Sequence, residues 1–244
     1  SVVGITGAVT GDETGIRAYT NAKVAITGSV QATGPNSNGI IINSGAEVTV
    51  SGNVQGGYSG VTAWSGKVSV GGNVGSTAAA GMGVFADNGA EVTVSNDVIS
   101  AGSWGVYAED GGSISVAGDV QGQDYGISVS RGAEVFVSGD VRTVTSDGAG
   151  VNAFETGEAT IDGNIQAHKA MTFGESDGAE IMPSTKVGYK TYSDGGDNPS
   201  FIWVKEALTA AGTATDDTAI LQIDNKTPSA RDKTWEINVT SGTV

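Results

Sequence analysis

The stretch GAEVTVSGNV at residues 45–54 recurs as GAEVTVSNDV at 89–98 and as GAEVFVSGDV at 132–141. In each copy the valines occupy alternate positions, which is the two-residue period of a β-strand with one buried face. A pair drawn from Gly, Asn and Asp follows, and these residues favour tight turns. Each copy therefore predicts a short strand, a turn and the start of a second strand.

The phrase belongs to a longer repeat. Each copy is marked by a Gly followed by an aliphatic residue, at an interval of 21 to 24 residues, and contains three short alternating runs. Strands this short are unstable as isolated hairpins, so each is expected to pair with its equivalent in the next copy, about 4.8 Å along a common axis. The marking residues are Gly15, Gly39, Gly60, Gly83, Gly105, Gly126 and Gly150.

These features predict an all-β fold, a right-handed parallel β-helix of about eight coils with about 22 residues per coil. Residues 1–186 are expected to form this solenoid. Residues 187–244 lose the phrase and are expected to form a β-rich C-terminal cap over the open coil, or to begin a following module. A β-sandwich is the alternative, but it does not explain why one phrase recurs at one-coil intervals. The gaps between strands lack the helical period of an α/β fold.

Net charge and composition limit the classes of partner that the chain is expected to bind. The 244 residues carry a formal charge of −15, which disfavours nucleic acid and anionic lipid as partners. The chain has no cysteine, and no apolar run is long enough to span a bilayer, so no membrane insertion is expected. It begins inside a repeat copy at Ser1 without a signal peptide, so it is expected to be part of a longer repeat chain.

One column of turn residues allows two interpretations. Asn and Asp side chains cap turns, and stacked Asn residues can hydrogen-bond from coil to coil. The alternative is a carboxylate ladder that binds cations, with Asp97, Asp119 and Asp140 as candidate metal ligands and Ca²⁺ as the possible cofactor. Calcium-binding β-roll and EF-hand motifs are absent from the sequence. The column consists of Ser29, Asn53, Asn73, Asp97, Asp119, Asp140 and Asn164.

Aromatic residues give the best candidate binding site. Several fall at outward positions of the strand that contains the marking Gly in successive coils, or at the corner just before that strand. Aromatic rings spaced one coil apart predict a platform for sugar rings or for a protein partner. Shielding of the corner by local packing is the simpler alternative. The candidate binding residues are Trp64, Phe85, Trp104, Tyr107 and Tyr125.

No catalytic residue is predicted. The single histidine, His168, lies in a variable corner and lacks the partners of a nucleophilic triad. A repeated column of glutamates that includes Glu47 and Glu91 is interpreted as a solvated strand edge. Carboxylates also gather at residues 87, 109, 110 and 155, but no acidic pair with an Arg or Lys beside it is evident. An enzyme that cleaves polysaccharides with paired carboxylates is the alternative function.

The units of the form GVxAxxGAEVTVSGNV resemble those of right-handed parallel β-helix proteins of bacterial surfaces, which include autotransporter passenger domains and filamentous-haemagglutinin-like adhesins. Pectin-lyase-like enzymes share this shape. The resemblance covers residues 1–186 and implies a non-enzymatic, adhesin-like or structural solenoid, secreted or on the cell surface. The expected partner is a host or environmental glycan or a surface protein. We expect the insertions at one corner of the coil to mark the interacting face.

Overall fold

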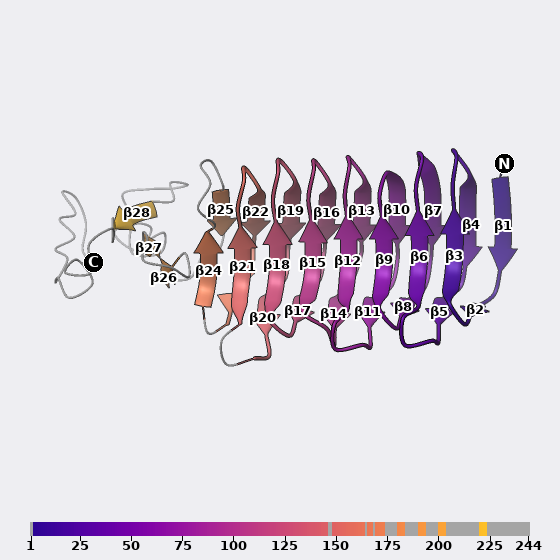
Figure 1. Ribbon diagram of the computed structural model, residues 1–244, viewed down its shortest axis with the longest axis horizontal. Coiled ribbons are helices and arrows are strands. Elements are labelled where there is room, and N and C mark those ends of the chain that lie inside the picture. Colours follow the sequence, from indigo (N-terminus) through magenta and orange to yellow (C-terminus); the bar gives the residue numbers. More distant parts are fainter. Residues whose placement is uncertain are drawn as a thin grey trace.

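The computed structural model is a parallel β-solenoid (Figure 1). The structure describes residues 2–145, 148–163 and 165–167, and beyond these only the backbone of the strands between residues 169 and 223. Three strands per coil stack into three parallel sheets, and the solenoid has about seven turns. The chain rises in front and descends behind as it advances from the N-terminus at the right, so the coil is right-handed (Figure 1).

Sheet A contains the first strand of each triplet in chain order: β1 (Val2–Thr6), β4 (Lys23–Thr27), β7 (Ala46–Val50), β10 (Gly66–Val70), β13 (Glu91–Val94), β16 (Ser113–Val116), β19 (Glu134–Val137), β22 (Glu158–Ile161) and β25 (Glu180–Pro183). Sheet B contains the shortest strands: β2 (Val9–Gly11), β5 (Val30–Ala32), β8 (Val54–Gly56), β11 (Val74–Ser76), β14 (Val98–Ser100), β17 (Val120–Gly122), β20 (Val141–Thr143) and β23 (Ile165–Gln166). Sheet C contains β3 (Thr14–Ala18), β6 (Asn38–Ile42), β9 (Ser59–Ala63), β12 (Met82–Ala86), β15 (Trp104–Ala108), β18 (Tyr125–Val129), β21 (Ala149–Ala153) and β24 (Lys169–Phe173).

Three further strands form an antiparallel sheet: β26 (Lys190–Ser193), β27 (Ser200–Trp203) and β28 (Ile220–Ile223). They agree with the β-rich character predicted for residues 187–244. The cap itself stays a prediction, because most of that segment lies outside the described residues.

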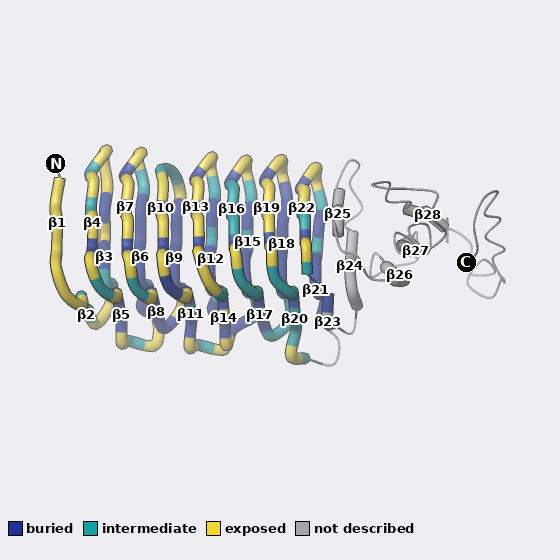
Figure 2. The backbone as a smooth tube through the Cα atoms, turned by 180° about the vertical axis from the view of Figure 1, so that it is seen from behind, coloured by how far each residue is buried: buried dark blue, intermediate teal, exposed yellow. Residues whose placement is uncertain are grey.

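The interior of the solenoid consists of stacked aliphatic side chains. In sheet A the register places Val48 opposite Val68 and Val68 opposite Val92, and all three side chains are buried. The intervening residues, such as Glu47 and Thr49, face water. Figure 2 shows this alternation along the strands. β-Branched side chains pack well in a pleated, half-buried sheet, and burying one such side chain is worth about 1.5–3 kcal/mol.

The Gly residues that mark the repeat are required by packing between coils. A Cβ atom built on Gly105 would lie 2.6 Å from the carbonyl oxygen of Gly126 in the next coil and 2.6 Å from a methyl carbon of Val120. A Cβ atom built on Gly83 would likewise lie 2.5 Å from the carbonyl oxygen of Gly105 and 2.4 Å from a methyl carbon of Val98. A side chain at this position would therefore force neighbouring coils apart. This close approach explains why Gly precedes the inward aliphatic residue in successive copies.

The corner between sheets C and A is a tight turn of two left-handed residues. In the coil around residue 88 these are Asn88, with φ of 49°, and Gly89, with φ of 71°. The corresponding turn one coil later uses Asp110 and Gly111, at 47° and 75°. Asn, Asp and Gly tolerate this backbone region better than other residues. The GAEV phrase thus begins with the glycine of this turn.

The corner between sheets B and C varies in length. It comprises residues 33–37, 57–58, 77–81, 101–103, 123–124 and 144–148 in successive coils. The prediction that insertions collect at one edge of the solenoid is confirmed by this arrangement, which lies along the lower edge of Figure 1.

We predict that Gly105→Ala lowers the free energy of unfolding by about 1–3 kcal/mol, the usual cost of overpacking a close-packed interior. Chemical denaturation followed by circular dichroism measures this loss. Gly4→Ala is the matched control, because a Cβ at Gly4 would have no atom within 4 Å. Equal stability of the two variants would contradict the proposed role of the Gly column.

Candidate functional site

Four of the predicted aromatic residues form one cluster on the outer face of sheet C. The register pairs Phe85 of β12 with Tyr107 of β15, and it pairs Trp104 of β15 with Tyr125 of β18. The ring centroids of Phe85 and Tyr107 lie 5.3 Å apart, those of Trp104 and Tyr107 6.0 Å apart, and those of Trp104 and Tyr125 6.1 Å apart. We call Phe85, Trp104, Tyr107 and Tyr125 the sheet C patch.

The rings of the sheet C patch do not form a flat platform, because Trp104 stacks on Tyr107 and Tyr125 while Phe85 is tilted by 53° against Tyr107. The Trp104 ring lies within 22° of parallel to Tyr107 and within 13° of Tyr125, so the ring faces partly cover each other. All four side chains are half-buried. A ligand would therefore contact ring edges and the outermost faces. Offset-stacked aromatic pairs stabilise a fold by about 0.5–1.5 kcal/mol beyond their burial, so the patch also contributes to packing.

Trp64 lies outside this stack. It follows strand β9, and its side chain is 39% exposed. The backbone N–H of Trp64 donates to the carbonyl of Ile42, and the N–H of Asp87 donates to the carbonyl of Ala63 one coil later. Trp64 and Asp87 therefore occupy equivalent positions, each directly after a strand of sheet C.

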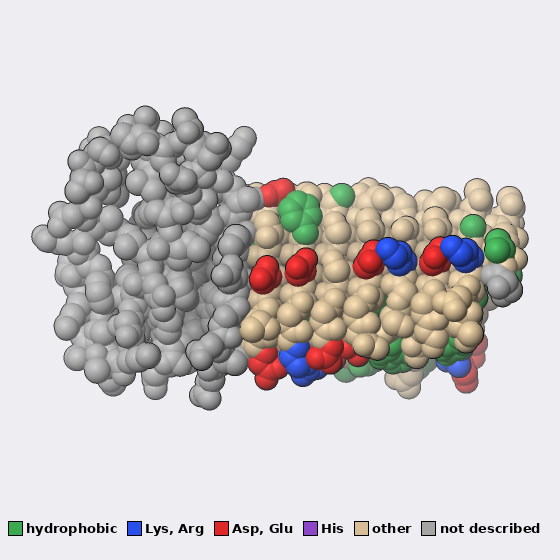
Figure 3. All heavy atoms as spheres, turned by 90° about the horizontal axis from the view of Figure 1, so that it is seen from above, with side chains coloured by type: hydrophobic (Ala, Val, Ile, Leu, Met, Phe, Trp, Pro, Cys, Tyr) green, Lys and Arg blue, Asp and Glu red, His purple; other side chains and the backbone are tan. Residues whose placement is uncertain are grey.

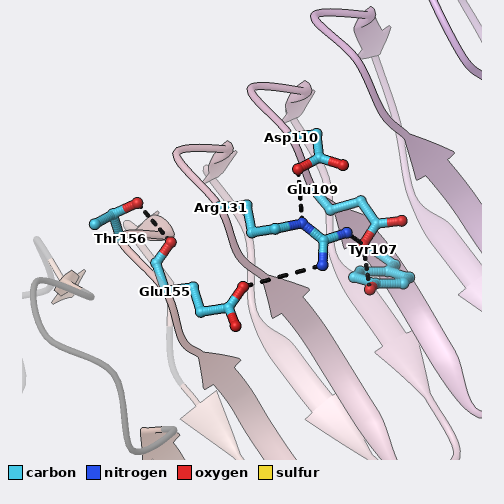
Figure 4. A network of polar contacts seen from close by, with 6 residues as sticks. All are labelled: Tyr107, Glu109, Asp110, Arg131, Glu155 and Thr156. Carbon is cyan, nitrogen blue, oxygen red and sulfur yellow. Dashed lines mark hydrogen bonds and ion pairs between the residues drawn. The ribbon is translucent and has the colours of Figure 1, made fainter.

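A charged network borders the patch at the corner between sheets C and A (Figure 4). The Tyr107 hydroxyl donates to Glu109 Oε2 at 2.7 Å, and the Arg131 guanidinium donates to the same oxygen. Arg131 Nε also donates to Asp110 Oδ1 at 2.6 Å, and its Nη1 lies 4.0 Å from Glu155 Oε2. Arg131 therefore links Glu109 and Asp110 of the preceding coil to Glu155 of the following coil.

This network corrects one expectation from the sequence. Glu109 and Asp110 form an acidic pair with an Arg directly beside them, whereas no such arrangement was expected. Arg131 comes from the next coil, 21 residues beyond Asp110. It occupies the left-handed turn position of Asp110 in its own coil, with φ of 50°. A non-glycine residue in this region costs about 1–2 kcal/mol, and Arg131 in this conformation makes ion pairs to both Glu109 and Asp110.

Burial and the neighbouring carboxylates shift two pKa values at this edge. Burial, followed by the hydrogen bond to Glu109, raises the pKa of Tyr107 to about 12. Tyr107 is therefore a hydrogen-bond donor at neutral pH and a poor general base. Burial also raises the pKa of Asp87, and the charges of Glu109 and Asp110 act in the same direction.

The Asn/Asp column forms a hydrogen-bonded ladder in the described coils. Asn53 Oδ1 accepts from the backbone N–H of Asn73 at 2.9 Å, and Asn73 Oδ1 accepts from Asp97 at 3.2 Å. Asp97 Oδ1 accepts from Asp119 at 2.9 Å, and Asp119 Oδ1 accepts from Asp140 at 2.8 Å. The turn interpretation of this column is therefore confirmed as far as Asp140. Asn164 lies outside the described residues.

The same contacts bear on the candidate metal ligands. One oxygen of Asp97 and one of Asp119 accept the ladder bonds, and Arg142 donates to the other oxygen of Asp119 while lying 4.0 Å from Asp140 Oδ2. Within residues 2–145, 148–163 and 165–167, no group of three His, Cys, Asp or Glu side chains is placed to hold a metal ion. Calcium binding by Asp97, Asp119 and Asp140 stays a prediction.

The glutamate column on sheet A is solvent-exposed. Lys23 contacts Glu47 at 2.7 Å and Lys67 contacts Glu91 at 2.7 Å, and both pairs are exposed. Figure 3 shows a row of acidic and basic side chains, red and blue, along one face of the solenoid. Exposed ion pairs contribute about 0–1 kcal/mol, so this column matches the predicted solvated edge. His168 lies outside the described residues.

No family model matches the chain, and no curated protein or solved structure is similar to it within the limits of the comparison. Within the part of the chain that the structure describes, no helix is long and apolar enough to cross a membrane.

Asp119 separates the ladder from the cation interpretation. We predict that Asp119→Ala lowers the free energy of unfolding by about 1–2 kcal/mol, because the N–H of Asp140 loses its acceptor. Asp119→Asn keeps an oxygen that can accept from the N–H of Asp140 and should lose less than about 1 kcal/mol, the value of the partly exposed ion pair with Arg142. Thermal unfolding with and without Ca²⁺ is the measurement. A calcium-dependent rise in the melting temperature that Asp119→Asn abolishes would favour the cation site instead.

Proposed function

We propose that this chain is a non-enzymatic, adhesin-like segment of a bacterial surface or secreted protein, in which a rigid solenoid presents a binding face to a glycan or a surface protein. The observation that carries this proposal is the sheet C patch, in which four aromatic side chains from three neighbouring coils gather on the outer face of one sheet. Aromatic clusters that remain partly exposed are common at recognition sites.

The rest of the solenoid supports a passive mechanism. The interior is filled with small aliphatic side chains, and each coil is hydrogen-bonded to its neighbours in all three sheets. Such a rod holds its outward side chains in fixed positions, which reduces the entropy that binding would otherwise cost. The bacterial surface location comes from the resemblance of the repeat units and is part of the proposal.

The geometry at the edge of the patch favours binding over polysaccharide cleavage. Burial and the hydrogen bond to Glu109 raise the pKa of Tyr107 to about 12, which favours the neutral phenol over the phenolate that a base would need. Glu109 Oε2 and Asp110 Oδ1 both accept hydrogen bonds from Arg131, so each carboxylate already has one oxygen engaged in an ion pair.

We predict that Trp104→Ala and Tyr107→Ala each weaken binding to a ligand found on an array of glycans and surface proteins by about tenfold or more, which corresponds to about 1.4 kcal/mol. Biolayer interferometry with the purified chain measures the loss. Phe136→Ala is the matched control, because Phe136 is 40% exposed on sheet A, away from the patch. Binding that survives both substitutions, or the absence of any bound ligand on the array, would contradict the proposal and leave a structural spacer.

A further inference from the structure

The edge of the sheet C patch carries excess negative charge. Asp87, Glu109, Asp110 and Glu155 lie near one another at this corner, and Arg131 is the basic residue that the contacts place among them. The carboxylates therefore outnumber the guanidinium by four to one. A ligand with carboxylate or sulfate groups would be repelled here, whereas a cationic ligand would be attracted.

Asp87 is the carboxylate that this network leaves without a cation. Arg131 donates hydrogen bonds to Glu109 and Asp110. Asp87 Oδ1 is buried and has no hydrogen-bond partner in the described structure, although the backbone N–H of Asn88 stabilises the carboxylate. Asp87 as a whole is only partly buried, so its negative charge can attract a cationic ligand to the exposed part of the side chain, while Oδ1 itself stays covered.

Aromatic side chains flank this carboxylate. Trp64 and Glu109 occupy the positions equivalent to Asp87 in the preceding and following coils, as the backbone hydrogen bonds from Asp87 to Ala63 and from Glu109 to Ala86 show. Phe85 precedes Asp87 by two residues and contacts Tyr107. A carboxylate beside aromatic rings is a favourable environment for an ammonium group, because the rings and the carboxylate both attract cations.

The shape of the surface favours a glycan over a peptide. Strands β9, β12, β15 and β18 lie inside sheet C and pair with neighbours on both sides, so a peptide has no free strand edge to extend at the patch. Recognition there must use side chains alone. The rings come from three successive coils and follow the solenoid axis, which suits a linear chain lying along that axis.

We infer that the ligand of the sheet C patch is a glycan of amino sugars with free amino groups, one of which binds Asp87 close to Trp64 and Phe85. This inference rests on the proposed function and names its ligand class. Linear oligomers of β-1,4-linked glucosamine, with their N-acetylated counterparts of equal length, are the probes that test it.

Isothermal titration calorimetry should give at least tenfold tighter binding of the glucosamine oligomer than of the acetylated oligomer, at a pH where the amines are protonated. Asp87→Asn should remove this preference. Burial disfavours the charge of Asp87, so the Asn variant is expected to fold, and thermal unfolding checks this. Glu134→Gln is the matched control, because it removes one exposed carboxylate from sheet A and should leave the preference intact.

The outcomes separate the two claims. Equal binding of both oligomers, weakened by Trp104→Ala, would overturn the amino-sugar inference and leave the proposed function standing. Binding of a lysine-rich peptide but of neither oligomer, lost in Asp87→Asn, would overturn the choice of a glycan. If no probe binds and Trp104→Ala changes nothing on the wider array, both claims fail.

Discussion

The stacking of equivalent residues, one coil spacing apart, is the constraint on which the rest of the structure depends. Parallel strands in neighbouring coils lie about 4.8 Å apart, so each position must tolerate a copy of itself above and below. Val98 and Val120 meet this requirement inside the coil, and Gly83 and Gly105 meet it where backbone approaches backbone. The phrase repeats in the sequence because each position must accept the same type of residue in the coils above and below.

The same constraint determines what polar residues do at the corners. Asn and Asp in the turn after sheet A each supply one oxygen to the next backbone N–H, so the column provides an acceptor for a turn N–H in successive described coils. At the opposite end of the sheet A strands, the left-handed turn accepts Asn, Asp and Gly readily. Arg131 occupies this left-handed position although it is not Asn, Asp or Gly, and it makes ion pairs with Glu109 and Asp110. Such departures mark the places where function is most reasonably sought.

The architecture was predictable because it depends on period and residue type. The alternation in GAEVTV, the spacing of the Gly residues and the variable corner all follow from local rules. The gathering of Phe85, Trp104, Tyr107 and Tyr125 was also predictable, since their positions in the repeat align. Their mutual stacking was not, because side-chain angles depend on neighbours in adjacent coils. The Arg131 network was missed for a related reason. Asp110, Arg131 and Glu155 share one turn position, and only the coil register brings them together.

The central claim is that the repeat determines shape and that the sheet C patch, where the copies differ, determines recognition. A variant that carries at each patch position the residue of another coil tests this most directly: Phe85→Thr as at Thr62, Trp104→Ser as at Ser59, Tyr107→Ser as at Ser128, and Tyr125→Ala as at Ala149. Circular dichroism and denaturant unfolding of this variant, with binding measured on the same sample, should show an intact β spectrum, cooperative unfolding and no ligand binding. Loss of the fold, or binding that persists in the folded variant, would contradict the account.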